Sequence, residues 1–227
     1  MPRRLRFVGG GYVYHVLNRA VARDRIFAKN RDYEAFEEVL VEAKEQVSMR
    51  VLAWCVMPTH WHLALWPHED GDLSEFMRWM TVTHTQRWHA AQRTAGTGPL
   101  YQGRFKSFPI EEDDHLWTVL RYVERNALRA NLVQRAEDWR WSSLWRRLRG
   151  DAAVLEAGPV PLPADWLQHV QSVETGAELA ALRSSVVRGT PFGEEAWQER
   201  TAKCLGLEST LRARGRPRKS SPPQELI

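Results

Sequence analysis

The sequence predicts an α+β fold: a ferredoxin-like or RRM-like antiparallel sheet with helices packed on one face, followed by a C-terminal helical appendage. Two observations lead to this prediction. Short runs rich in apolar and β-branched residues alternate with longer stretches in which apolar residues recur every three or four positions. Their order along the chain is strand, helix, strand, strand, helix, strand, helix.

The strands are the short apolar runs of this pattern. Pro58 lies between the second and third runs, where a proline favours a turn or a bulge over a continuous strand. The four predicted strands cover residues 12–17, 50–56, 61–66 and 105–110.

Three helices connect or follow these strands, over residues 32–46, 72–92 and 116–129. The first carries its apolar residues on one face and most of its glutamates elsewhere. Asp113 and Asp114 precede the third, in the positions of an N-cap and a first-turn acid.

The character of the chain changes after residue 133. Three tryptophans surround Ser142 and Ser143, which we expect to cap a short helix that ends near residue 149. A proline-rich break at 158–163 is followed by three short helical patterns. We therefore predict a main domain over residues 1–150, a small helical region over 151–211 and a basic, disordered tail over 212–227.

Composition is that of a globular protein: 43% of the 227 residues are hydrophobic and 26% are charged. No stretch has the apolar length of a membrane span, and we expect a cytoplasmic protein without a membrane partner. Cys55 and Cys204 have no spacing that indicates a disulfide framework. The net charge of +4 and the pI near 9.3 fit a polyanion as partner, although many proteins this basic bind no nucleic acid.

His60-Trp61-His62 is the most informative motif. Side chains alternate along a strand, so the two imidazoles project together while Trp61 points into packing. Two imidazoles on one face make two thirds of a facial metal site. Alone the pair is weak evidence for a metal site, because paired histidines often only hydrogen-bond to each other or to a backbone carbonyl.

A third candidate ligand lies on the predicted helix 116–129. Tyr122 and Asn126 stand four residues apart, so they lie close together on one side of the helix. Arg121, Arg125 and Arg129 form a second stripe beside them. An ordinary amphipathic helix with a solvated arginine face explains that stripe better than a catalytic role does, whereas for Tyr122 with Asn126 the structural and functional explanations are about even.

Together these motifs resemble the single-tyrosine HUH transposases, and the wider sequence is similar to the REP-associated tyrosine transposases. The similar stretches are 14–19 (YHVLNR), 26–27 (IF), 56–63 (VMPTHWHL), 102–107 (QGRFKS), 121–133, 141–143 (WSS), 191–193 (PFG) and 207–212 (LESTLR). The chain departs from the family after Asn126, where Ala127 and Asn131 stand in place of the family's proline and glycine.

The resemblance implies a metal-dependent endonuclease and strand transferase that acts on single-stranded DNA carrying a hairpin, such as a REP-like element in the nucleoid. Tyr122 would be the nucleophile, giving a 5′-phosphotyrosine, and His60, His62 and Asn126 would hold Mg²⁺ or Mn²⁺. The protein would work as a monomer or as a homodimer.

Basic residues near these motifs are candidates for DNA binding. They are Arg104, Lys106, Arg121, Arg125, Arg129, Arg214 and Arg216. The last two lie in Arg214-Gly215-Arg216-Pro217, which looks like the core of an AT-hook, an arm that enters the minor groove.

Two other readings remain open. A non-catalytic module could bind single-stranded nucleic acid on a four-stranded sheet in the manner of an RRM. A zinc-stabilised structural protein would need four protein ligands, and no cysteine lies at a suitable spacing.

Overall fold

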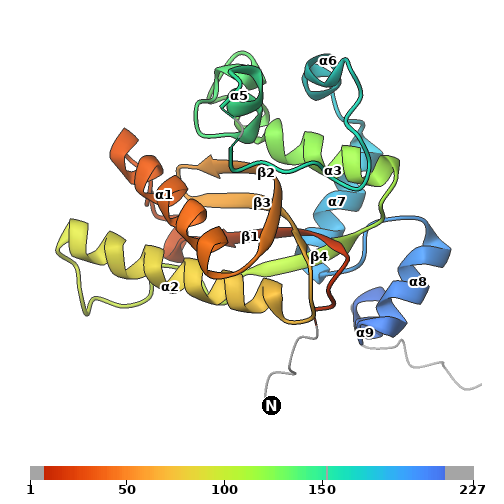
Figure 1. Ribbon diagram of the computed structural model, residues 1–227, viewed down its shortest axis with the longest axis horizontal. Coiled ribbons are helices and arrows are strands. Elements are labelled where there is room, and N and C mark those ends of the chain that lie inside the picture. The colour runs from red at the N-terminus through yellow and green to blue at the C-terminus, as the bar shows by residue number, and fades with distance from the viewer. Residues whose placement is uncertain (1–7, 152, 213–227) are drawn as a thin grey trace, which may run out of the picture.

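The computed structural model describes residues 8–151 and 153–212. Its centre is a four-stranded antiparallel sheet in the order β2-β3-β1-β4, which confirms the predicted fold class (Figure 1). The strands are β1 (Val13–Arg19), β2 (Met49–Met57), β3 (His60–Pro67) and β4 (Lys106–Ile110). The helices are α1 (Asn30–Gln46), α2 (Asp72–Gln92), α3 (Asp114–Glu124), α4 (Asn126–Arg129), α5 (Ser143–Leu148), α6 (Trp166–Gln171), α7 (Gly176–Arg188), α8 (Glu195–Cys204) and α9 (Glu208–Leu211), with short 3-10 turns at Val21–Arg23 and Ala136–Asp138.

Helices cover both faces of the sheet, which corrects the expectation of one covered face. The helices α1 and α2 pack on the face that carries Trp61 and Val16. Helices α3, α6 and α7 pack on the opposite face, around Phe108 and Val123 (Figure 1). Strands buried on both faces lose the simple alternation of apolar and polar residues, and β1 is buried at almost every position.

A buried polar chain joins the α2 face to the segment that leads into β4. The Trp61 indole donates to the Tyr101 hydroxyl at 3.0 Å, and that hydroxyl pairs with Nδ1 of His84 at 2.8 Å. Burial lowers the pKa of His84 to about 4, so its imidazole is neutral at pH 7. These hydrogen bonds hold Tyr101 against β3 and α2, next to the region of the candidate site.

The C-terminal helices share the core of α3. Trp166 of α6 and Leu182 of α7 are buried in the same apolar cluster as Val123. Thr175 caps α7 by accepting from the Glu178 amide at 3.1 Å, while the Glu178 carboxylate accepts from the Thr175 amide at 2.6 Å. The division at residues 150 and 211 stays a prediction.

No helix in the described ranges is both long enough and apolar enough to span a bilayer.

Candidate active site

His60 and His62 lie on β3 and face the α3 side of the sheet. Their ring centroids are 5.1 Å apart. Trp61, between them, points to the other face and is fully buried. The strand geometry therefore orients these three side chains as the sequence predicts.

Tyr122 extends from α3 toward this histidine pair. Its ring centroid is 5.8 Å from that of His62, and the two rings are nearly perpendicular. The guanidinium of Arg129 lies over the Tyr122 ring at 4.0 Å, where the electron-rich face of the ring attracts a cation. The structure thus brings a phenol, two imidazoles and a positive charge together.

Asn126 begins a short helix of its own. The predicted helix 116–129 is divided, with α3 ending at Glu124 and α4 starting at Asn126, although the Arg125 amide still bonds to the Arg121 carbonyl at 2.8 Å. Asn126 is 7% exposed and its Nδ2 is buried without a partner. Within the described residues its side chain makes no hydrogen bond, and such a buried, unpaired amide costs about 1–3 kcal/mol. A buried polar group without a hydrogen-bond partner calls for an explanation, and a ligand or an ion that binds there is one.

Both histidines are neutral at pH 7. Burial lowers the pKa of His60 to about 4, with smaller contributions from Arg19 and Arg129. Burial also holds the pKa of His62 well below its usual value, reinforced by the neighbouring imidazoles. Neutral imidazoles keep the lone pair that a metal ligand needs.

One nitrogen of each imidazole is already engaged. Nδ1 of His60 pairs with the Thr59 hydroxyl at 3.0 Å, and Nδ1 of His62 pairs with Nε2 of His15 at 2.9 Å. Both Nε2 atoms lack a hydrogen bond in the part of the chain that the structure describes. Two free imidazole nitrogens and a free amide oxygen on Asn126 are a donor set that fits a divalent cation.

His15 is a member of this cluster that the sequence analysis did not assign. It lies on β1, is fully buried, and its ring stacks on that of His62 with centroids 5.1 Å apart. Burial, with a smaller contribution from Arg129, lowers its pKa to about 3. Leu17 pairs with His62 across the sheet, and His15, two residues earlier on β1, faces the same side of the sheet. Only the register of the two strands therefore shows that His15 lies next to His62.

A cleft of about 700 Å³ opens beside Tyr122. Four of its lining residues are basic and form no ion pair within the described ranges: Arg19, Arg104, Lys106 and Arg183. The sequence analysis singled out Arg104 and Lys106 and did not find Arg19 or Arg183. Unpaired cations around a cleft favour an anionic ligand such as a phosphodiester.

The arginine stripe of α3 and α4 has internal partners instead. Arg121 pairs with Glu178 at 2.5 Å, and Arg125 and Arg129 both pair with the buried Glu174. Their role as DNA contacts is untested. Because each guanidinium already meets a carboxylate, we leave these three arginines out of the proposed interface. Arg214 and Arg216 lie outside the described residues.

A second group of possible cation ligands lies at the far end of β4. Donor atoms of Glu111, Asp113 and His115 are within 4.8 Å of one another. Asp113 accepts from both the His115 amide and its imidazole, and Glu111 accepts from the Glu194 amide. These bonds form the N-terminal cap of α3 and a link to α8, so this group has a structural explanation.

Comparisons with known proteins identify the family of this chain. The family model described as "Transposase IS200 like" matches residues 10–126, just over half of the chain. A REP-associated tyrosine transposase of Escherichia coli K12 is 22% identical over 173 residues, which cover 76% of this chain and 94% of that protein. A Haemophilus influenzae protein provisionally given the same name is 24% identical over 170 residues, covering 70% and 89%.

Among solved structures, the fold is similar to that of a REP-associated tyrosine transposase bound to a REP hairpin, with a TM-score of 0.53 and 20% identity. The match covers 78% of this chain and 99% of that one.

Proposed function

Because this chain belongs to the family of IS200-like transposases, we propose that it cleaves and rejoins single-stranded DNA with Tyr122 as the nucleophile. One observation supports the proposal. Tyr122 lines a cleft bordered by unpaired cations, and its ring lies 5.8 Å from that of the neutral His62, whose Nε2 is free and whose ring is 5.1 Å from that of His60. A candidate nucleophile therefore lies beside both a cleft suited to an anion and two candidate cation ligands.

The proposed reaction is a direct transfer of the phosphodiester to Tyr122. The Tyr122 oxygen forms a bond to phosphorus while the bond from phosphorus to the 3′-oxygen breaks. The phenol loses one proton and the departing 3′-oxygen gains one, so the strand is released with a 3′-hydroxyl. The product is a 5′-phosphotyrosine, which a 3′-hydroxyl can attack to rejoin DNA without ATP. Arg19 and Lys106 hold the phosphate backbone in the cleft by charge.

Mg²⁺ or Mn²⁺ is the cofactor we propose for Nε2 of His60, Nε2 of His62 and Oδ1 of Asn126. Such an ion neutralises charge on phosphate oxygens and polarises phosphorus. Two neutral imidazoles and an amide leave its charge undiminished, which suits an anionic substrate.

The substrate we propose is a single strand with a hairpin, acted on in the cytoplasm. The solved relative is bound to a REP hairpin, and attack on a backbone phosphate requires an unpaired, accessible strand.

The direct test uses a labelled single-stranded hairpin and Mn²⁺, followed by a denaturing gel. Wild type forms a covalent protein–DNA complex. Tyr122→Phe abolishes it and leaves hairpin affinity nearly unchanged, while the matched control Tyr12→Phe, at a half-buried tyrosine outside the cleft, behaves as wild type. A covalent complex that persists in Tyr122→Phe would refute the nucleophile assignment.

The histidines are tested in the same assay. His60→Ala prevents cleavage even in excess Mn²⁺ and retains DNA binding. Full activity in that variant would make the pair structural, and binding by wild type without any covalent complex would favour the non-catalytic reading.

A further inference from the structure

His15 of β1 connects that strand to His62 of β3, one of the proposed metal ligands. It is 0% exposed, and its Nε2 lies 2.9 Å from Nδ1 of His62. Phe108 of β4 packs beside its ring at a centroid distance of 4.9 Å. The His15 imidazole is therefore confined by β1, β3 and β4 together.

The hydrogen bond between two neutral imidazoles can run in either direction. If His62 offers the lone pair of Nε2 to a cation, its own proton must be on Nδ1. That proton is then donated to Nε2 of His15, which places the proton of His15 on Nδ1. The opposite direction would protonate Nε2 of His62 and close it to a cation.

We propose that His15 is a positioning residue that fixes the orientation and tautomer of His62 and so keeps Nε2 of His62 open to a divalent cation. This inference rests on the metal dependence of the proposed function. Hydrogen bonds from ligand imidazoles to a second group do this in metal sites generally, and their removal lowers metal affinity about 10- to 100-fold.

A cost in stability supports a functional role. Nδ1 of His15 is buried and has no partner in the described part of the chain. An apolar side chain in the space between Phe108 and His62 would remove this unpaired nitrogen, but it would leave Nδ1 of His62 without its partner. The two histidines together are thus a poorer choice for packing than two apolar side chains.

Two variants separate positioning from packing. His15→Leu removes the acceptor, and His15→Gln keeps one, because its Oε1 reaches to where Nε2 lies. Mn²⁺ affinity is measured on DNA-free protein by electron paramagnetic resonance, and stability by urea unfolding. We expect His15→Leu to bind Mn²⁺ about 10- to 100-fold more weakly and to lose some stability, because Nδ1 of His62 is left without a partner. We expect the Mn²⁺ affinity of His15→Gln to stay within a few-fold of wild type.

Equal Mn²⁺ affinity in wild type and His15→Leu overturns the inference, as does an equal loss in His15→Gln. If His15→Leu fails to fold, the decision passes to His15→Gln and to nitrogen-15 NMR of wild type with Mg²⁺. A proton on Nε2 of His62 in that spectrum also overturns it. None of these measurements requires DNA cleavage, so the proposed function can fail separately.

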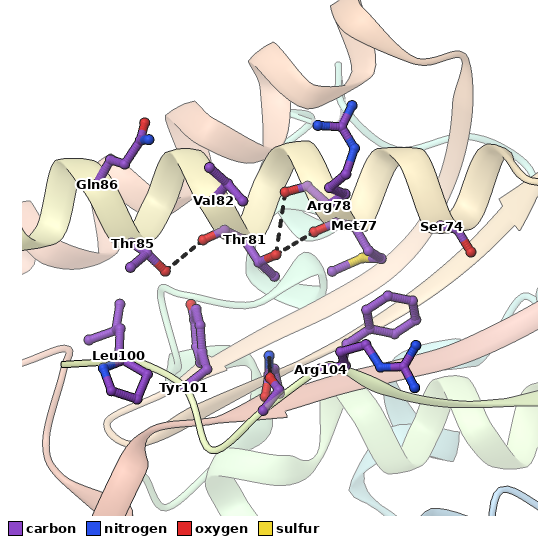
Figure 2. Close-up of a pocket in the computed structure, with 14 residues that line it drawn as sticks. Ser74, Met77, Arg78, Thr81, Val82, Thr85, Gln86, Leu100, Tyr101 and Arg104 are labelled. Carbon is purple, nitrogen blue, oxygen red and sulfur yellow. Dashed lines mark hydrogen bonds between the residues drawn. The ribbon is translucent and has the colours of Figure 1, made fainter. Parts of the chain in front are cut away.

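A second, independent feature is a groove of about 670 Å³ between α2 and the segment 99–105 (Figure 2). Met77 and Tyr101 line it and are both buried. The bonds from Tyr101 to Trp61 and His84 hold this wall in place. The groove is thus preformed.

Its chemistry combines an apolar surface with positive charge. Its lining contains no carboxylate and two arginines, Arg78 and Arg104, which form no ion pair within the described residues. The hydroxyls of Thr81 and Thr85 donate back to carbonyls of α2, as the dashed lines in Figure 2 show. Val82 is 48% exposed.

The groove adjoins the cleft beside Tyr122. Four residues line both spaces: Asn18, Gly103, Arg104 and Phe105. Asn18 Nδ2 donates to the Gly103 carbonyl at 3.2 Å, which fixes the ridge between them. The groove runs along α2 from Ser74 to Gln86, about 18 Å at 1.5 Å per residue.

We infer that this groove binds an unpaired segment of the DNA strand that flanks the phosphate attacked by Tyr122. Bases lie on its apolar surface and phosphates meet Arg78 and Arg104, which is how single strands are held without pairing. The inference deepens the proposed function, because it specifies where the strand continues beyond the reacting phosphate.

The test compares affinities for hairpin DNAs with and without single-stranded extensions on either side, measured without Mn²⁺ so that no cleavage occurs. Wild type binds one extended series about tenfold more tightly than the blunt hairpin. Val82→Glu places a negative charge in the groove at an exposed position and removes this advantage. The matched control Val41→Glu, on α1 at a position 40% exposed, keeps it.

An unchanged advantage in Val82→Glu overturns the inference, as does an equal loss in Val41→Glu. Arg78→Gln should reduce the slope of log affinity against log salt by about one for the extended DNA only. Formation of the covalent complex is scored separately, so loss of the nucleophile assignment leaves this result standing.

Discussion

Glu174→Gln tests whether the segment between α6 and α7 holds α3 and α4 in place. Glu174 lies between α6 and α7, is 5% exposed and accepts from Arg125 at 3.1 Å and from Arg129 at 2.5 Å. Arg129 also donates to the Tyr122 carbonyl at 3.1 Å and covers the Tyr122 ring. One carboxylate therefore pairs with two guanidiniums beside Tyr122.

The expected loss follows from burial. Removing one partner of a buried pair costs about 3–5 kcal/mol, because a charge is left without compensation. The side chains of Arg125 and Arg129 are 11% and 18% exposed, so water screens them in part and we expect about 3 kcal/mol. The matched control is Glu42→Gln, whose partner Arg87 and own side chain are 46% and 37% exposed, with an expected loss of about 0.2–1 kcal/mol.

Urea unfolding followed by tryptophan fluorescence measures both variants. With a slope of about 2–3 kcal/mol per molar urea, Glu174→Gln should lower the midpoint by about 1 M and Glu42→Gln by much less. Covalent-complex formation should also slow in Glu174→Gln at saturating DNA, because Arg129 loses its anchor. A midpoint shift no larger than that of Glu42→Gln would refute the reasoning.

Three further predictions concern other parts of the molecule. His84 has a pKa of about 4 when folded and 6.5 when unfolded, so the unfolded chain takes up the proton first and stability falls between pH 6.5 and pH 4, by about 3 kcal/mol from this group; His84→Gln should show a shallower decline in urea titrations across that range. Thr175→Ala removes the cap of α7 and should cost about 1 kcal/mol in the same unfolding assay, whereas an unchanged midpoint would mean that the cap contributes nothing. Truncation after Leu211 should weaken binding to A·T-rich duplex DNA, and unchanged affinity for every DNA form would remove the AT-hook hypothesis.

The strands were predictable because their apolar pattern is local. Residues 50–56 and 61–66 were predicted and are observed within β2 and β3, joined at Pro58 as expected. The covering of both sheet faces depends on where α3 lies after β4, which no local pattern states. The near-complete burial of β1, which the structure reveals, is what a sheet covered on both sides requires.

The site was predictable only where the sequence spacing of two residues is enough to tell which way their side chains point. A period of two orients His60 and His62, and a spacing of four relates Tyr122 to Asn126. His15 joins them through the register of β1 against β3, and Arg183 joins the cleft because α7 folds back beside β4. Both relations depend on residues far apart in the sequence.

The arginines of α3 and α4 show why a stripe of positive charge in a sequence does not reveal its partner. A guanidinium binds a phosphate and a carboxylate by the same planar hydrogen-bonding geometry, so Arg121, Arg125 and Arg129 suit DNA or an acidic partner equally well in sequence. The acids that they meet, Glu174 and Glu178, lie some fifty residues later. A charge already paired inside the protein releases few counterions when DNA binds, so it adds little to affinity. The unpaired cations of the cleft, and not this stripe, should therefore set the salt dependence of DNA binding.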